Sequence, residues 1–144
     1  MGKVALLATV VALGKCCSAE TLTATCKGLT GWSVGYETGK PQSEEDGFVG
    51  STFTYSWIIG SPSATIITQS SKAAGSVPAT DTARVISKPS LVTFIVSYER
   101  GTWIHTYFPA AKVIMVSRHV DGRGPFKDSA AGGLFHGRCD ASVR

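Results

Sequence analysis

Two cysteines, Cys26 and Cys139, lie near opposite ends of residues 20–144, the part of the chain that follows a predicted N-terminal export signal. An even pair of cysteines in an exported chain is most simply one disulfide, because such compartments are oxidising. A bridge between them would close a loop of more than a hundred residues. We therefore expect the first and last strands to be neighbours, as in a closed barrel or a sandwich. The alternative is two independent free thiols.

The export signal is predicted from the first residues. Met1-Gly2-Lys3 precedes an unbroken apolar run from Val4 to Leu13, and small residues lead up to Ala19. One lysine before about ten apolar residues, with small residues at the cleavage position, is typical of a signal peptide. We predict a signal peptide over residues 1–19 and one domain over residues 20–144, a length that suits a single modest core.

Two alternatives for the N-terminus are less favoured. A retained membrane anchor needs about twenty apolar residues, and this run stops at Gly14-Lys15. A bacterial lipoprotein carries a small residue directly before its acylated cysteine, whereas Lys15 precedes Cys16 and Cys16 precedes Cys17. We expect a secreted or periplasmic protein with no membrane span after signal cleavage.

The charge of the chain bears on its partners. The formal net charge of +4 falls to +2 once the two lysines of the signal are removed. A small positive charge spread along the chain lacks the clustered Lys and Arg of a nucleic-acid surface. We expect no nucleic-acid partner and no cofactor, which leaves a small ligand or an envelope protein as the candidate partner.

The mature chain consists of short runs rich in β-branched and aromatic residues, separated by Gly, Pro, Ser and Asp. Gly50 is expected to mark a β-bulge within one of them. Strands are predicted over residues 21–27, 32–36, 48–59, 64–69, 83–87, 91–98, 102–108, 112–120 and 134–140. Seven to nine such strands predict an all-β fold, a small antiparallel β-barrel or β-sandwich closed by one disulfide.

The strands over residues 91–98 and 102–108 predict a hairpin with a three-residue loop, in which Gly101 supplies the left-handed position. This register pairs Val96 with Ile104 on the core face. The opposite face then carries the predicted ligand or partner contacts Ile95, Trp103, His105 and Tyr107. Aromatic side chains facing away from the core could line a barrel interior or form a contact surface. The alternative is a second core layer in a sandwich.

The stretch Gly31-Trp32-Ser33-Val34-Gly35 fits the G-x-S-x-G pattern of a nucleophile elbow. That motif requires a strained turn from a strand into a helix, and the residues that follow, 36–41, cannot begin an amphipathic helix. We interpret the glycines as accommodating a bent strand around Trp32. The chain is predicted not to be an enzyme, with a serine hydrolase using Ser33 as a minor alternative.

Metal sites are not indicated by the remaining polar residues. His105, His119 and His136 are far apart in sequence, without the close spacing typical of zinc ligands. The acidic run over residues 44–46 lacks the alternating oxygen ligands of a calcium loop. We interpret it as a solvated loop.

Two short stretches resemble known families. The segment from Thr25-Cys26-Lys27-Gly28 through Tyr36 resembles the start of small periplasmic inhibitors of lysozyme, which are disulfide-bridged antiparallel β domains. Their serine–glycine–x–x–tyrosine signature is absent, so no functional residue is carried over. Gly101-Thr102-Trp103 is similar to the G-x-W motif of lipocalins. In that family the motif lies on the first strand, so we interpret this match as chance.

These observations leave three functional hypotheses. The leading one is a non-enzymatic exported domain that binds a small apolar ligand or a partner protein. The second is an inhibitor of an envelope enzyme, whose loop over residues 121–124 would enter the enzyme's cleft. The third is the hydrolase that would use Ser33.

Overall fold

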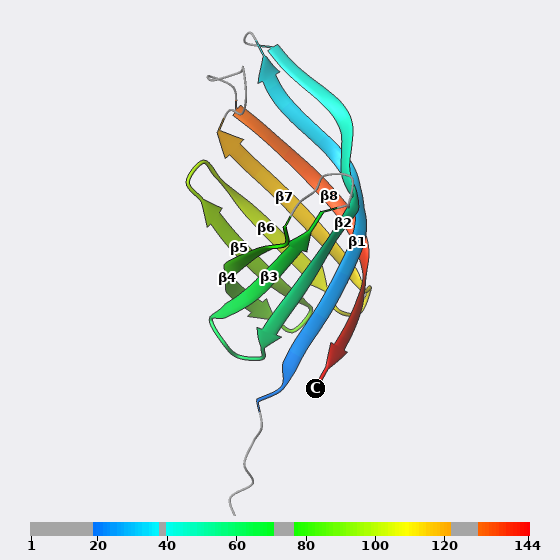
Figure 1. Cartoon of the computed structure of the whole chain (residues 1–144), viewed down its shortest axis with the longest axis vertical. Coiled ribbons are helices and arrows are strands. Elements are labelled where there is room, and N and C mark those ends of the chain that lie inside the picture. Colours follow the sequence, from blue (N-terminus) through cyan, green and yellow to red (C-terminus); the bar gives the residue numbers. More distant parts are fainter. Residues whose placement is uncertain (1–18, 38–39, 71–76, 122–129) are drawn as a thin grey trace, which may run out of the picture.

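The computed structural model describes residues 19–37, 40–70, 77–121 and 130–144, and the strands in these ranges form one closed antiparallel barrel. Each strand pairs with the next in sequence, and the last pairs with the first (Figure 1). The strands are β1 (Thr21–Glu37), β2 (Lys40–Ile58), β3 (Ser63–Gln69), β4 (Ala79–Lys88), β5 (Leu91–Tyr98), β6 (Gly101–Phe108), β7 (Val113–Asp121) and β8 (Ala130–Val143). The all-β prediction is confirmed, and the sheet closes as a barrel rather than a sandwich. The predicted signal peptide lies, except for Ala19, outside the described residues.

The predicted disulfide closes the barrel between its first and last strands. Cys26 on β1 is directly opposite Cys139 on β8, and their Sγ atoms are bonded. Both cysteines are buried. The predicted pairing and the predicted contact between the first and last strands are therefore confirmed.

The core of the molecule is the inside of the barrel. Along each strand alternate side chains point inward, as the two-residue period of a strand requires. An eight-stranded barrel is just wide enough for its own side chains or one small ligand. Here large aromatic groups occupy most of the interior, and the largest fully buried side chains are Tyr55, Tyr107, Phe53, Phe94 and Phe135.

The β1–β2 hairpin is longer than the sequence predicts. Residues 30–37 of β1 pair with residues 40–47 of β2, and the pairing register shifts between Lys27 and Leu29. Gly50 lies in the part of β2 opposite this irregularity, and the glycine with a positive φ there is Gly28 of β1. The acidic run over residues 44–46 is therefore part of β2, and its prediction as a solvated loop was wrong. The reason is non-local, because the hydrogen-bond partners that hold this run in a strand belong to β1.

The predicted register of the β5–β6 hairpin was also wrong. The turn contains two residues, so Gly101 pairs with Tyr98, and Val96 pairs with Trp103 rather than Ile104. Gly101 does not have a positive φ. Its missing side chain has another role, because a Cβ there would collide with the His119 carbonyl of β7. A shift of one residue exchanges the two faces of a strand, so the aromatic face of β6 points into the barrel.

Several predicted strands are longer than expected. β8 begins at Ala130 and ends at Val143, whereas it was predicted over residues 134–140. β4 begins at Ala79 instead of residue 83. The small residues in these segments have a low intrinsic preference for strands. They are held in strands by backbone hydrogen bonds to the neighbouring strands. In the loop over residues 121–124, which the inhibitor hypothesis uses, only Asp121 is among the described residues.

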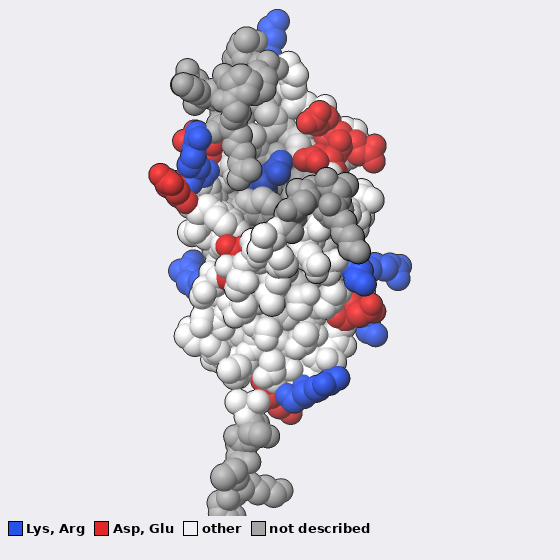
Figure 2. All heavy atoms as spheres, viewed as in Figure 1, with Lys and Arg blue, Asp and Glu red and all other residues white. Residues whose placement is uncertain are grey.

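The surface carries charges of both signs. On the face viewed in Figure 2, Lys and Arg are interspersed with Asp and Glu toward the margins, and uncharged residues cover the centre. Among the described residues, no helix has the length and apolar character needed to cross a bilayer.

Candidate ligand site at one end of the barrel

A cavity of about 170 Å³ lies inside the barrel at the end where β3 and β5 finish and β4 and β6 begin. Five consecutive strands, β2 to β6, contribute to its wall. Most of the lining is apolar or aromatic, and the described residues that line it are Phe53, Ile66, Thr68, Ala79, Asp81, Val96, Tyr98, Trp103 and His105. An apolar cavity of about 150 Å³ can hold a molecule as large as benzene, so this one has room for a single-ring ligand.

The polar groups of the cavity include Asp81 and Tyr98. The Tyr98 hydroxyl donates a hydrogen bond to Oδ2 of Asp81 over 2.9 Å. Within the described part of the chain, no Lys or Arg forms an ion pair with Asp81; the ion pair found there joins Arg118 and Asp46. Asp81 is half-buried, its hydrogen bond with Tyr98 is accessible to solvent, and it is the charged group of an otherwise mainly apolar wall among the described residues.

His105 forms the inner part of the wall and is 2% exposed. Its Nδ1 is 2.8 Å from the hydroxyl oxygen of Tyr55, and the two groups share a hydrogen bond. Burial lowers the pKa of His105 to about 4, so the imidazole is neutral at pH 7. Burial also raises the pKa of Tyr55. This pair satisfies two polar groups that would otherwise be costly inside an apolar core.

Trp103 separates the cavity from a charged network in the same end of the barrel. Its ring stacks on His105 with centroids 5.9 Å apart, and the guanidinium carbon of Arg118 lies 5.8 Å from its centroid. Arg118 also lies 5.4 Å from the ring centroid of Phe135. Cations are attracted to the faces of aromatic rings, so these two rings hold the guanidinium between them.

The network consists of Arg118, Asp46 and Ser33. Ser33 Oγ donates to Asp46 Oδ2 over 2.5 Å, and Arg118 Nη2 donates to Ser33 Oγ over 3.0 Å. Arg118 Nη2 and Asp46 Oδ2 are 3.4 Å apart. The hydrogen bond from Ser33 is the main cause that lowers the pKa of Asp46; the Gly47 amide and Arg118 add to it, against an opposing effect of burial. Asp46 is thus held as a carboxylate that neutralises Arg118.

This arrangement does not resemble a serine-hydrolase site. Ser33 lies in the middle of β1, paired on both sides with β2 and β8, and not at a turn into a helix. Its hydroxyl donates to Asp46 and accepts from Arg118. The lowered pKa of Asp46 makes this carboxylate a weak base, poorly suited to activate a serine nucleophile. Gly31 has a structural role, because a Cβ there would collide with the Leu134 carbonyl oxygen of β8.

The four predicted contact residues do not form one surface. Trp103 and His105 line the cavity. Tyr107 is 2% exposed and pairs with Val92, but it lies near the end of β6 that is far from the cavity. Ile95 pairs with Ile104 on the outer face, so its predicted place beside the aromatic residues was wrong.

Sequence reasoning missed the cavity residues Phe53, Asp81 and Tyr98 and the charged pair Asp46–Arg118. The alternation of Phe53, Tyr55 and Trp57 did indicate an inward face. Asp81 lies in a stretch of small and polar residues between the strands predicted over residues 64–69 and 83–87. Only its pairing with Ile66 on β3 shows that it points inward.

The three histidines are also dispersed in the structure. His105 points into the barrel, whereas His119 and His136 are exposed on β7 and β8. Over the described residues, no group of three His, Cys, Asp or Glu side chains is placed to hold a metal ion.

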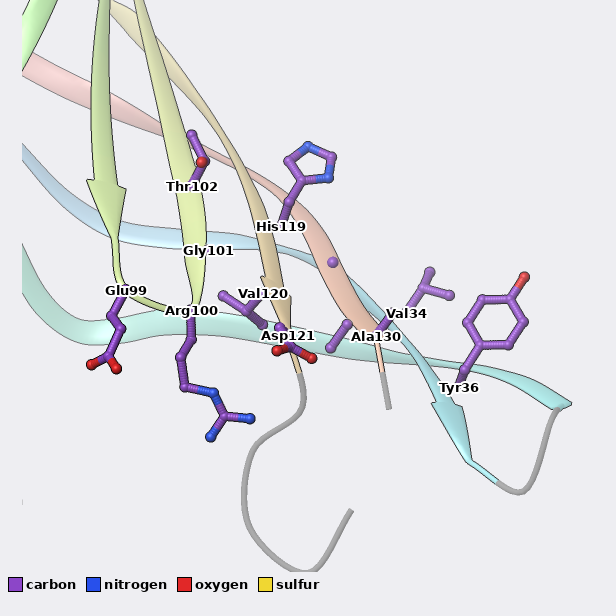
Figure 3. A pocket seen from close by; sticks show the side chains of 12 residues that line it. Val34, Tyr36, Glu99, Arg100, Gly101, Thr102, His119, Val120, Asp121 and Ala130 are labelled. Carbon is purple, nitrogen blue, oxygen red and sulfur yellow. The ribbon is translucent and has the colours of Figure 1, made fainter. Parts of the chain in front are cut away.

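A second, wide-open hollow of about 630 Å³ lies near the rim of the barrel, over β1, β6, β7 and β8. Gly132 of β8 pairs with Val34 of β1 on one side and with His119 of β7 on the other. Because glycine has no side chain, space is left between the side chains of Val34 and His119. Val34, Tyr36 and His119 project to the same side of the sheet (Figure 3). The hollow continues an apolar strip of exposed side chains: Trp32, Val34, Tyr36 and Leu134.

Comparison with known proteins provides no family for this chain. A scan against protein-family models finds no match, and a search of curated proteins finds no sequence with significant similarity.

Proposed function

We propose that this chain is a non-enzymatic, secreted or periplasmic domain that binds a small, mainly apolar ligand inside one end of its barrel. The observation that carries the proposal is the cavity of about 170 Å³ among Phe53, Trp103 and His105. Small-molecule sites are concave and mostly apolar, with a few polar groups that orient the ligand. Eight-stranded barrels are wide enough to hold one small ligand.

The polar groups in the wall of the cavity support ligand binding rather than imperfect packing of the core. Its wall contains a carboxylate, a hydroxyl and the neutral His105 beside the aromatic rings. A cavity left by imperfect packing of an apolar core would be lined by apolar side chains, because burying a polar side chain without a partner is costly. The wall therefore combines shape with a means of orienting a ligand.

Filling the cavity tests the proposal. Single-ring compounds of graded size are titrated into the mature, oxidised protein, and binding is followed by tryptophan fluorescence, since Trp103 lies in the wall. We expect Ala79→Leu, which extends a side chain from the wall into the cavity, to abolish binding. Ala110→Leu, in an exposed turn, is the matched control and should bind like the wild type. Equal binding by both variants would place the ligand elsewhere and reject the proposal.

A partner protein is the second candidate, favoured by the apolar strip on the outside of β1 and β8. Trp32 is 58% exposed and Leu134 53% exposed, and large exposed apolar patches mark interaction sites. A photo-crosslinking residue at position 32, compared with one at the exposed Asp140, tests this in the native host. One discrete adduct of defined mass at position 32 alone supports a partner; identical patterns at both positions exclude it.

A further inference from the structure

We infer that the ligand of the interior cavity carries a protonated amino group next to its ring, with the ammonium against Asp81 and the ring among the aromatic side chains. This inference rests on the proposed function and specifies its ligand class. The structural basis is the juxtaposition of several aromatic rings with the Asp81 carboxylate, which forms no ion pair with a described Lys or Arg, in a cavity of single-ring size.

The first argument is charge. Asp81 is the only Asp, Glu, Lys or Arg among the described residues that line the cavity. Its Oδ2 accepts the hydrogen bond of Tyr98, and no cationic side chain of the described ranges pairs with it. A partly buried carboxylate is stabilised by an opposite charge and destabilised by a like charge. A cationic ligand would complete this site, whereas an anionic ligand would meet an uncompensated negative charge.

The second argument is the surroundings of that carboxylate. Phe53, Tyr98 and Trp103 all border the cavity. The faces of aromatic rings attract ammonium groups, most strongly where water is partly excluded. The neutral His105 adds no competing positive charge, as its lowered pKa indicates. The nearby cation, Arg118, does not border the cavity and is neutralised by Asp46.

The third argument is the neighbouring network, in which this barrel combines aromatic rings, a carboxylate and a cation whose charges neutralise each other. In the same end of the molecule, Arg118 lies against two aromatic rings and pairs with Asp46. The cavity repeats two of these three components, the rings and the carboxylate. The component that no described residue supplies is the cation, and the cavity is the space where a ligand would supply it.

The test compares two probes of nearly equal shape, benzylamine and benzyl alcohol, by isothermal titration calorimetry on the mature, oxidised protein at pH 7. Benzylamine is protonated at this pH and benzyl alcohol is neutral. We expect benzylamine to bind at least tenfold more tightly. Asp81→Asn keeps an oxygen that can accept the Tyr98 hydrogen bond but removes the charge. It should reduce the affinity for benzylamine about tenfold and leave that for benzyl alcohol unchanged. Asp140→Asn, at an exposed position on β8, is the matched control.

The outcomes separate this inference from the proposed function. If both probes bind with equal affinity and Asp81→Asn changes neither, the cavity binds ligands but the inference is wrong. If single-ring compounds of either charge fail to bind, the proposed function itself fails. If Asp140→Asn weakens benzylamine as much as Asp81→Asn does, the effect comes from net charge and not from the cavity, which also overturns the inference.

Discussion

Acidification should destabilise this barrel through one buried histidine. His105 is 2% exposed, and burial lowers its pKa to about 4, whereas in the unfolded chain a histidine has a pKa of about 6.5. Between these values the unfolded chain binds a proton that the folded protein does not. The stabilising contribution is therefore fully present above about pH 6.5 and is lost as the pH falls toward 4.

The magnitude follows from the two pKa values. At pH 4.5 the unfolded chain is almost fully protonated at this position and the folded protein only in part. Each unit of pKa difference corresponds to about 1.4 kcal/mol, so moving from pH 7.5 to pH 4.5 should lower the free energy of unfolding by about 2.5 kcal/mol through His105 alone. Asp46 acts at lower pH, because a carboxyl with a lowered pKa loses its stabilising effect only as the pH falls below about 4.

The assay is urea unfolding of the oxidised protein at half-unit steps from pH 7.5 to 4.5, compared with His105→Gln. Glutamine does not titrate and can still form a hydrogen bond with Tyr55. We expect the difference in unfolding free energy between the two proteins to change by about 2.5 kcal/mol across this range. His119→Gln, an exposed position on β7, should follow the wild-type curve. Parallel curves for wild type and His105→Gln would refute the reasoning.

Three further predictions concern stability. Replacing both cysteines of the disulfide by alanine should lower the unfolding free energy by about 4–5 kcal/mol in the chain-entropy account, since the bridge spans a separation of 113 residues; a loss below about 1 kcal/mol in urea unfolding would contradict this. Gly31→Ala should cost about 1–3 kcal/mol, because its Cβ meets the backbone of β8, while Gly35→Ala, whose Cβ has nothing within 4 Å, should be nearly neutral in the same assay. A double-mutant cycle of Asp46→Asn and Arg118→Met should give a coupling of about 1 kcal/mol that weakens with salt, as for a partly exposed pair; zero coupling at low salt would show that the network contributes only packing.

Much of the fold could be predicted from residue patterns. Leu22, Ala24 and Cys26 alternate along the sequence of β1, and Phe53, Tyr55 and Trp57 along that of β2, and all six are buried. Ile59, which continues the second alternation in the sequence, lies beyond the end of β2 and is 43% exposed. The cysteine pair predicted that first and last strands meet. These predictions succeeded because they depend on local periodicity and on one covalent constraint.

The binding site could be predicted only in part. Trp103 and His105 were singled out, but on a face shared with Ile95. The error came from one residue in the length of the β5–β6 turn, and such a shift exchanges the two faces of every residue that follows in the strand. Asp81, the charged group of the cavity, carried no local signal because its strand begins in a run of small and polar residues.

The sequence by itself determined that the described domain is built from strands and which cysteines can join its first and last strands, but for β6 it did not determine which face points inward. The tertiary structure decided the closure into a barrel, the register of the β5–β6 hairpin and the placement of Asp81 and Trp103 on the wall of one cavity. The physical reason is that strand pairing is satisfied by backbone groups, which are the same for every residue type. The choice among possible registers therefore depends on how side chains from distant strands fill one interior.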